Sequence, residues 1–205
     1  MLTSRRLPAV GWRRLVLILV ATALTLALPA AALAAPSHEK KGTIVDEYFV
    51  TADQLRAAGL LVDQSDPDPG IEPQWGCVFD CWYLRFLTYT GETNVFRTQA
   101  KGSPGPMTLT LSSTLTVSNS FTANVGVKAG VVSAGVGFNV TWSASQTYSA
   151  STYVPSGACR IIKAYDTYKN YRFEVWDQNF IGDPFKVGSG TAKKFIGVWY
   201  QVVTC

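Results

Sequence analysis

Few side chains of this 205-residue sequence are suited to acid–base or nucleophilic chemistry. The single histidine, His38, stands in a polar stretch where no neighbouring pattern would orient it. Hydrolysis by a serine–histidine or cysteine–histidine pair needs an oriented histidine, and no glycine-rich phosphate loop follows an expected strand. We therefore expect a protein that is not an enzyme and that uses no cofactor and no metal ion.

A pair of carboxylates is the remaining catalytic alternative, because glycoside hydrolysis runs on two acidic side chains. The candidates for such a pair are Asp80, Asp166, Glu174, Asp177 and Asp183. Carboxylates are common on the surface of any protein, so their presence does not by itself predict an active site.

The N-terminal residues 1–34 have the composition of a secretion signal. A basic, arginine-containing start is followed by the apolar run 15–28 and by a small-residue cleavage site, Ala32-Leu33-Ala34. An uncleaved membrane anchor is the alternative, although Pro29 interrupts the apolar stretch. We expect cleavage after Ala34, which leaves residues 35–205 as one secreted, extracellular domain.

The four cysteines, Cys77, Cys81, Cys159 and Cys205, are even in number, and two disulfides are expected in an exported protein. Zinc binding is a poorer alternative, because Cys77 and Cys81 do not have the usual two-residue spacing. In an extended strand their sulfurs would lie about 13 Å apart, too far to bond with each other. In that case each would bond Cys159 or Cys205, and the order of pairing stays open.

The charge of the chain changes when the signal is removed. The formal net charge of +4 is carried by the arginines of the signal, so the mature chain is neutral. Acidic residues dominate 36–95 and basic residues dominate 96–205. Two such halves would either pack on each other or give the molecule a polar axis. No basic cluster has the density that nucleic-acid binding needs, and we expect no nucleic-acid partner.

Most of the mature sequence predicts strands and turns, so the expected fold class is all-β. Thr51 and Gln54 form a capping-box pattern that opens one short N-terminal helix, 52–58, which Gly59 ends. The expected strands are 74–89, 159–168, 171–176 and 194–204, with a turn at 169–170 and loops at 65–70, 101–106 and 181–186. We expect an elongated antiparallel sheet or sandwich that also contains one long amphipathic hairpin.

The hairpin is predicted within residues 102–159, which carry a single charged side chain, Lys128. Apolar residues alternate with Ser, Thr, Gly and Asn, first at odd positions and, after Val131, at even positions. This alternation is typical of strands with two unlike faces, and the change of phase is typical of a turn or bulge. Segments 121–131 and 134–144 are therefore predicted as two strands long enough to cross a bilayer. Their membrane-inserting face consists of Phe121, Ala123, Val125, Val127, Ala129, Val131, Ala134, Val136, Phe138, Val140 and Trp142.

The Ser/Thr-rich segment 107–154 resembles the stem of the aerolysin-like β-pore-forming proteins, in which an alternating hairpin enters a membrane. The resemblance implies a toxin-like, membrane-active protein whose identical chains form a homo-oligomeric ring on a target membrane, because a lone hairpin has unpaired edges. It also implies that Cys159 tethers the base of the stem. The family usually has a longer body and a separate receptor-binding domain, for which only 35–101 remains here.

The alternative is a secreted β-sandwich that turns the apolar face of the hairpin towards its own core and acts on no membrane. Ser and Thr are then ordinary solvent-facing strand residues. Such a structural or binding module would have a glycan or surface receptor as its partner, since exposed aromatic side chains stack on sugars or anchor partners. The aromatic candidates are Trp75, Trp82, Trp176, Trp199 and Tyr200, unless they are core residues.

Overall fold

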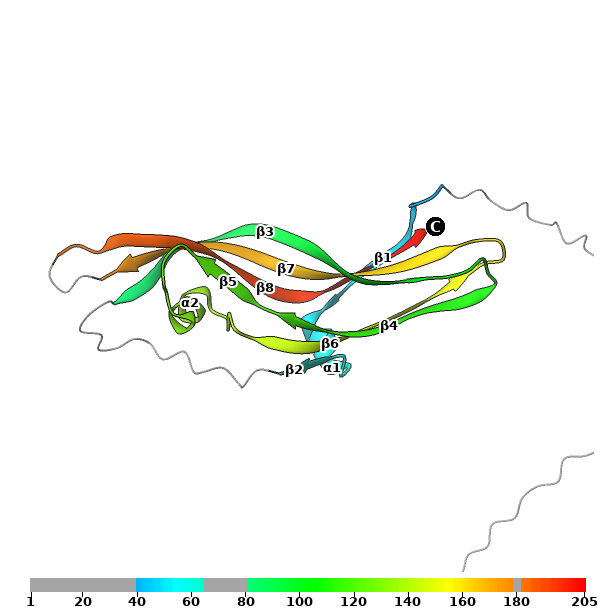
Figure 1. Ribbon diagram of the computed structural model, residues 1–205, viewed down its shortest axis with the longest axis horizontal. Helices are drawn as coiled ribbons and strands as arrows, with labels where there is room; N and C mark the ends of the chain where they lie inside the picture. The colour runs from blue at the N-terminus through cyan, green and yellow to red at the C-terminus, as the bar shows by residue number, and fades with distance from the viewer. Residues whose placement is uncertain (1–39, 65–80, 179–181) are drawn as a thin grey trace, which may run out of the picture. The chain divides into compact units, whose positions relative to one another are not determined.

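Strands make up most of the described part of the chain, which in this computed structural model comprises residues 40–64, 81–178 and 182–205. The paired strands run antiparallel, so the expected all-β fold class is confirmed (Figure 1). The predicted secretion signal, the loop 65–70 and residues His38, Trp75, Cys77 and Asp80 lie outside the described residues.

The larger sheet has the strand order β1-β8-β7-β3. Its strands are β1 (Ile44–Thr51), β3 (Trp82–Lys101), β7 (Arg160–Asp177) and β8 (Phe185–Thr204). A short fifth strand, β5 (Ser120–Ala123), also pairs with β8. β8 therefore has β7 on one edge and β1 and β5, in succession, on the other.

Three strand boundaries differ from the sequence prediction. The strand expected at 74–89 does not end at Tyr89, because β3 continues to Lys101 and pairs with β7 over that length. The turn expected at 169–170 is wrong: β7 runs straight through it, because both residues pair with β3 and with β8. A register shift between Thr167 and Tyr168 replaces the turn. The closing strand begins at Phe185 rather than at 194, since residues 185–193 pair with the second half of β7.

The smaller sheet has the order β2-β6-β4, formed by β2 (Leu61–Asp63), β4 (Met107–Ser118) and β6 (Ser143–Val154). Alternate residues of β4 and β6 are buried against the larger sheet, as a half-buried strand requires. The main core contains Leu109, Leu111, Val117, Ala144, Tyr148, Ala150 and Val154 from the smaller sheet and Ile162, Ala164, Val198, Tyr200 and Val202 from the larger one.

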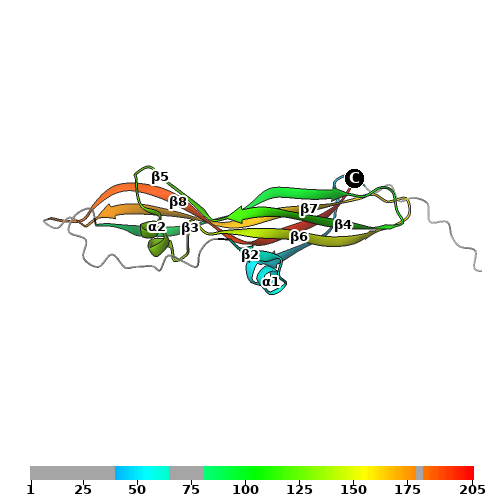
Figure 2. The same ribbon diagram turned by 60° about the horizontal axis from the view of Figure 1, so that its bottom comes forward.

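The predicted N-terminal helix is confirmed as α1 (Ala52–Ala57). The Gln54 amide donates a hydrogen bond to Thr51 Oγ1, and the Thr51 amide donates one to Gln54 Oε1, which completes the capping box. Leu55 of α1 is buried in the main core. α1 and β2 lie together beside β6 in both views (Figures 1 and 2).

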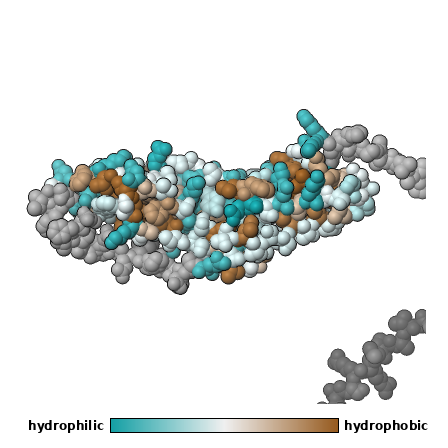
Figure 3. Space-filling view, in the orientation of Figure 1, coloured by the Kyte–Doolittle hydropathy of each residue, from teal (hydrophilic) through white to brown (hydrophobic). Residues whose placement is uncertain are grey.

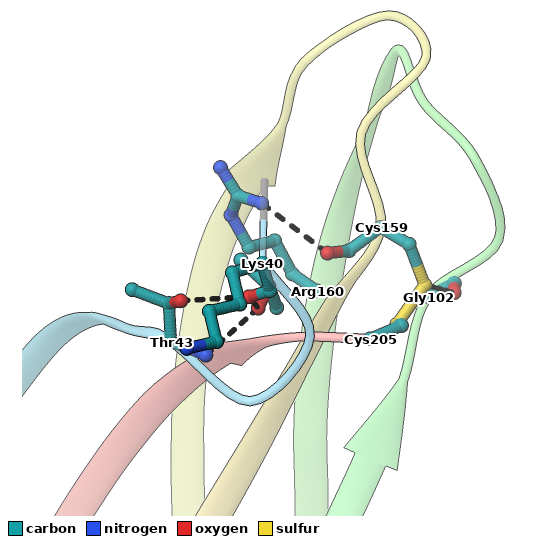
Figure 4. The surroundings of a disulfide bond; sticks show 7 residues. Lys40, Thr43, Gly102, Cys159, Arg160 and Cys205 are labelled. Carbon is teal, nitrogen blue, oxygen red and sulfur yellow. Dashed lines mark hydrogen bonds between the residues drawn. A yellow bond between two sulfur atoms is a disulfide. The ribbon is translucent and has the colours of Figure 1, made fainter. Parts of the chain in front are cut away.

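A disulfide joins Cys159, just before β7, to Cys205, just after β8, with 5.3 Å between their Cα atoms (Figure 4). Beside it, Arg160 Nη1 donates to the Cys159 carbonyl, and Thr43 Oγ1 donates to the Lys40 carbonyl. A crosslink over 46 residues stabilises the fold by about 4 kcal/mol through the entropy of the unfolded chain. The expectation that Cys77 and Cys81 each bond one of these cysteines is therefore wrong. Cys81 is disulfide-bonded elsewhere.

Candidate functional site: the insert between β4 and β6

The predicted hairpin strands 121–131 and 134–144 are wrong for this structure. β4 and β6 pair from Met107↔Val154 to Ser118↔Ser143, and the chain between them, residues 119–142, leaves this ladder. We call residues 119–142 the insert. It forms β5 and a second helix, α2 (Ala129–Val136), where the sequence predicts one helix only, near the N-terminus. In Figure 1 the insert, in green, lies at the ends of β4 and β6 against the long strands.

The apolar face of the insert is buried against the larger sheet, which is why it does not form a free hairpin here. Val127, Val132, Val136 and Val140 are buried in a second core with Phe173, Val175 and Ala192 of β7 and β8. Phe121, Ala123, Val125, Ala129, Val131 and Phe138 are partly buried against the same core. Burial of apolar surface against the protein thus overrides the strand pattern of the insert.

Two predicted face residues lie elsewhere. Trp142 packs on the main core and stacks on Phe195, with 6.0 Å between the ring centroids. Its indole N–H donates to Asp63 Oδ1 over 2.7 Å. Ala134 is exposed to solvent on α2. The structure therefore brings nine of the eleven predicted face residues into one cluster, and Ala134 and Trp142 lie outside it.

Two glycines of β8 allow the insert to approach closely. A Cβ atom added at Gly190 would lie 2.5 Å from both the Phe173 ring and the Thr122 carbonyl oxygen. One added at Gly188 would lie 2.6 Å from the Val125 side chain. Because no side chain other than hydrogen fits at either position, these glycines determine how the insert docks.

Helix α2 forms against the preference of its own sequence. Its eight residues include two glycines and three valines, which together with Ser133 disfavour the helix by about 4 kcal/mol relative to alanine. Lys128 at the N-cap makes no side-chain capping bond, and no acidic residue lies in the first turn. Close packing on β3 holds the helix instead: a Cβ atom at Gly135 would lie 2.5 Å from Leu84. α2 thus depends on tertiary contacts.

The register of β4 and β6 is informative about the insert. The pairs from Met107↔Val154 to Ser118↔Ser143 match one for one, without a bulge. If the same register continued through residues 119–142, Ala129 would pair with Val132, and Gly130 and Val131 would form the turn between the two strands. A two-residue turn with glycine first is the composition of the type II′ hairpin turn. The insert therefore has the length and the turn residues to complete the β4–β6 hairpin.

The continued register also divides the insert into one apolar and one polar face. Directly opposed residues of antiparallel strands point to the same face. The opposed apolar pairs are Phe121/Val140, Ala123/Phe138, Val125/Val136, Val127/Ala134 and Ala129/Val132. The other face holds Thr, Asn, Gly and Ser, and Lys128 lies beside the turn. Strands 119–129 and 132–142 would each have the length that spans a bilayer.

A buried charge cluster fastens β4 and β6 to the larger sheet. The Asp166 carboxylate is inaccessible to solvent and accepts hydrogen bonds from the hydroxyls of Tyr148, over 2.6 Å, and Tyr168, over 3.3 Å. Arg97 Nε lies 3.0 Å from the same carboxylate, as an ion pair without hydrogen-bond geometry. Arg97 Nη2 donates to the Thr116 carbonyl over 2.6 Å. The cluster therefore links β3, β4, β6 and β7, and loss of one partner would leave a buried charge unpaired.

Burial controls the protonation of this cluster. Desolvation raises the pKa of Asp166, and the hydrogen bond from Tyr148 and the charge of Arg97 oppose this shift. Desolvation also raises the pKa values of Tyr148 and Tyr168, and the Asp166 carboxylate raises both further. Burial raises the pKa of Tyr200 to about 12, although the Ser149 amide donates to its hydroxyl.

The candidate carboxylates for catalysis occupy separate places. Asp166 belongs to the buried cluster, and Glu174 Oε1 accepts a hydrogen bond from Lys186 over 2.6 Å, which lowers the pKa of Glu174. Asp177 Oδ2 accepts one from the Trp82 indole over 3.3 Å, and Asp183 is exposed.

Within residues 40–64, 81–178 and 182–205, no three His, Cys, Asp or Glu side chains gather in a way that could hold a metal ion.

The aromatic candidates are divided between the core and the surface. Tyr200 is a buried core residue, and Trp82 packs against the second core. Trp176 carries the Arg85 guanidinium 5.0 Å above its ring centroid. Trp199 is half-buried on the larger sheet. The sequence therefore identifies exposed aromatics only in part.

Sequence reasoning missed the residues that hold the insert in place. Leu84, Gly188 and Gly190 shape its docking, and Asp166 was considered only as a catalytic carboxylate. The glycines do leave a signal, because an isolated glycine in a strand indicates a bulge or a close backbone approach. Pairing of Asp166 with Arg97 is set by long-range register and has no local signal.

Comparison with known proteins gives no relative: no family model matches this chain, and no curated protein matches its sequence. In the described segments, none of the helices combines the length and the apolar content needed to cross a membrane. Functional interpretation therefore starts from the geometry of the insert.

Substitution of Gly190 by alanine is expected to release the insert selectively. The new methyl group overlaps Phe173 and Thr122, and overpacking of this kind costs about 1–3 kcal/mol. Hydrogen exchange of amides in 120–142 should then accelerate about 5- to 100-fold, while amides of β4 and β6 keep their protection. Gly126→Ala is the matched control, because no atom lies within 4 Å of its added Cβ. Unchanged exchange in the Gly190 variant would contradict this role.

Alkaline pH is expected to unfold the protein through its buried tyrosines. The folded-state pKa values of Tyr148, Tyr168 and Tyr200 lie above the ordinary value of 10, so their contribution to stability is complete below pH 10. This contribution to stability is lost progressively as the pH rises above 10, and that of Tyr200 is lost as the pH passes through about 12. Tyrosinate absorbance and circular dichroism should be measured together while the pH is raised. We expect the buried tyrosines to ionise only at the pH at which the circular dichroism shows that the fold is lost. Complete ionisation of the tyrosines at a pH below that at which the circular dichroism changes would contradict this expectation.

Proposed function

We propose that this protein is a secreted, non-catalytic, membrane-inserting β protein that forms pores in the manner of the aerolysin-like proteins it resembles. The observation that supports this best is the bulge-free register of β4 and β6. Continued through the insert, it yields a glycine-first turn, an apolar face and a polar face, which are the three features of a bilayer-spanning hairpin.

The proposed mechanism exchanges one apolar partner for another. In the docked state β7 and β8 cover the valines of the insert. In the inserted state lipid covers the same residues, while Thr122, Asn124, Gly126 and Thr141 line a water-filled lumen. Both edges of the hairpin need partners in lipid, so identical chains must pair edge to edge in a ring.

The part of the molecule that stays in place is also defined in this proposal. β4 and β6 remain attached to the larger sheet through Asp166, Arg97 and Tyr148. The Asn119 amide already donates to the Trp142 carbonyl over 2.9 Å, which is the next rung of the β4–β6 ladder. Pairing of the two hairpin strands can therefore extend from Asn119 and Trp142 towards the turn. At the opposite end of the hairpin, the Cys159–Cys205 bond holds the chain that follows β6.

An extracellular binding module is the second candidate. It is favoured by the burial of the apolar face in the second core, which accounts for the alternation without a membrane. In this case the insert stays docked, and the partner is a glycan or surface receptor.

A substitution at Ala134 can distinguish the pore-forming function from the binding module. Val127 and Val136 are buried, so aspartate there would disrupt the core under either candidate. Ala134 is exposed in the docked state but belongs to the lipid face of the extended hairpin. Ala134→Asp should preserve the fold and its melting temperature while reducing dye release from liposomes at least tenfold. A carboxylate at this depth of the lipid face costs up to about 1 kcal/mol per chain, and every chain of the ring carries it.

Asn124→Asp is the matched control for that experiment. It adds the same charge on the polar face and keeps the acceptor for the Ser189 amide. Wild type and Asn124→Asp should therefore release dye from vesicles that contain sterol and glycolipid. Equal release by the Ala134 variant would contradict the hairpin mechanism, and no release by the wild type would favour the binding module.

A further inference from the structure

A row of aromatic side chains crosses the outer face of the larger sheet. Phe49 of β1 is opposite Trp199 of β8, Trp199 is opposite Tyr165 of β7, and Tyr165 is opposite Phe96 of β3. Each of the four strands thus contributes one aromatic residue at the same level. With strands about 4.8 Å apart, the row is about 14 Å long.

The row faces away from the main core. The neighbouring residues Ala164, Val198 and Tyr200 point into the core, and successive residues of a strand point to opposite faces. Phe96 is 52% exposed and Phe49 is 37% exposed, while Tyr165 and Trp199 are partly exposed. The end rings contact their neighbours, with centroids 6.4 Å apart for Phe49 and Trp199 and 5.7 Å apart for Phe96 and Tyr165. Figure 3 shows hydrophobic residues, in brown, set among hydrophilic ones on one face of the molecule.

The adjacent row on the same face carries hydrogen-bonding side chains. This row consists of Glu47, Gln201, Lys163 and Gln99, again directly opposed. The first three lie two residues from the aromatic residue of their strand, and Gln99 lies three residues from Phe96, because the register of β3 shifts between Phe96 and Thr98. Gln201 Nε2 donates to Glu47 Oε2 over 3.3 Å. Two amides, one carboxylate and one ammonium offer donors and acceptors with no net charge. A row of rings beside a neutral row of donors and acceptors is therefore preformed on a rigid sheet.

We infer that this aromatic row and its polar neighbour bind a neutral oligosaccharide. Ring faces carry a negative quadrupole that attracts the polarised C–H groups of a pyranose. Sugar hydroxyls both donate and accept, which matches the mixed polar row. An anionic membrane surface would require an excess of Lys and Arg, whereas these two rows carry one lysine, Lys163, and one glutamate, Glu47. The site lies on β1, β3, β7 and β8, so it is present whether or not the insert leaves the larger sheet.

Phe96→Ala tests the inference, because it removes an exposed ring at the end of the row. Binding would be measured on an array of immobilised neutral oligosaccharides and confirmed by titration with the strongest soluble one. We expect wild type to bind and the Phe96 variant to bind at least tenfold more weakly. Phe96→Trp should restore binding, since it keeps a ring, and Tyr153→Ala is the control, because it removes an exposed ring from β6.

Three results would overturn the inference: no binding by wild type to any neutral oligosaccharide, binding that is unchanged in Phe96→Ala, or Phe96-dependent binding to sugar-free lipid vesicles instead. Ala134→Asp should bind the array like wild type. Failure of sugar binding is therefore distinguishable from failure of the pore proposal, which is measured by dye release.

Discussion

The insert has one strongly apolar face, and that face must be covered at all times. In this structure its partners are Phe173, Val175 and Ala192 of the larger sheet. The four buried valines contribute about 6 kcal/mol or more of hydrophobic stabilisation, a large share of the net stability of a typical domain. Under the proposed mechanism, the conformation of residues 119–142 depends on which apolar surface covers this face, the larger sheet or a lipid bilayer.

Local preference and tertiary packing disagree within the insert. The α2 residues disfavour a helix and lack caps, yet they form one because Gly135 fits against Leu84. Conflict between local and global preference is unusual in minimally frustrated proteins and concentrates at functional sites. β4 and β6 show no such conflict, and the Asp166 cluster links them to the larger sheet.

Much of the fold follows from the sequence, and the differences have physical causes. The all-β class and the capped helix at 52–57 depend on local periodicity and capping, which a single sequence displays. The alternation of 121–127 is also preserved, with the apolar side chains turned inward and the polar ones outward. The partner of the apolar face could not be predicted, because Gly188 and Gly190 are brought to it by the long-range pairing of β5 with β8. The Cys159–Cys205 pairing depends on the long-range pairing of β7 with β8, and the Asp166–Arg97 contact depends on that of β3 with β7.

The central claim is that the insert must leave the larger sheet for the protein to form pores. A reversible disulfide between β5 and β8 tests this claim most directly. Thr122 and Thr191 are exposed, directly opposed residues of β5 and β8, so Thr122→Cys with Thr191→Cys can form a cross-strand disulfide. We predict that the oxidised double variant is folded but releases no dye from liposomes, and that reduction restores release. Wild type treated with the same reductant controls for the native disulfides. Dye release by the oxidised variant at the wild-type rate would show that β5 need not leave β8, and would contradict the account.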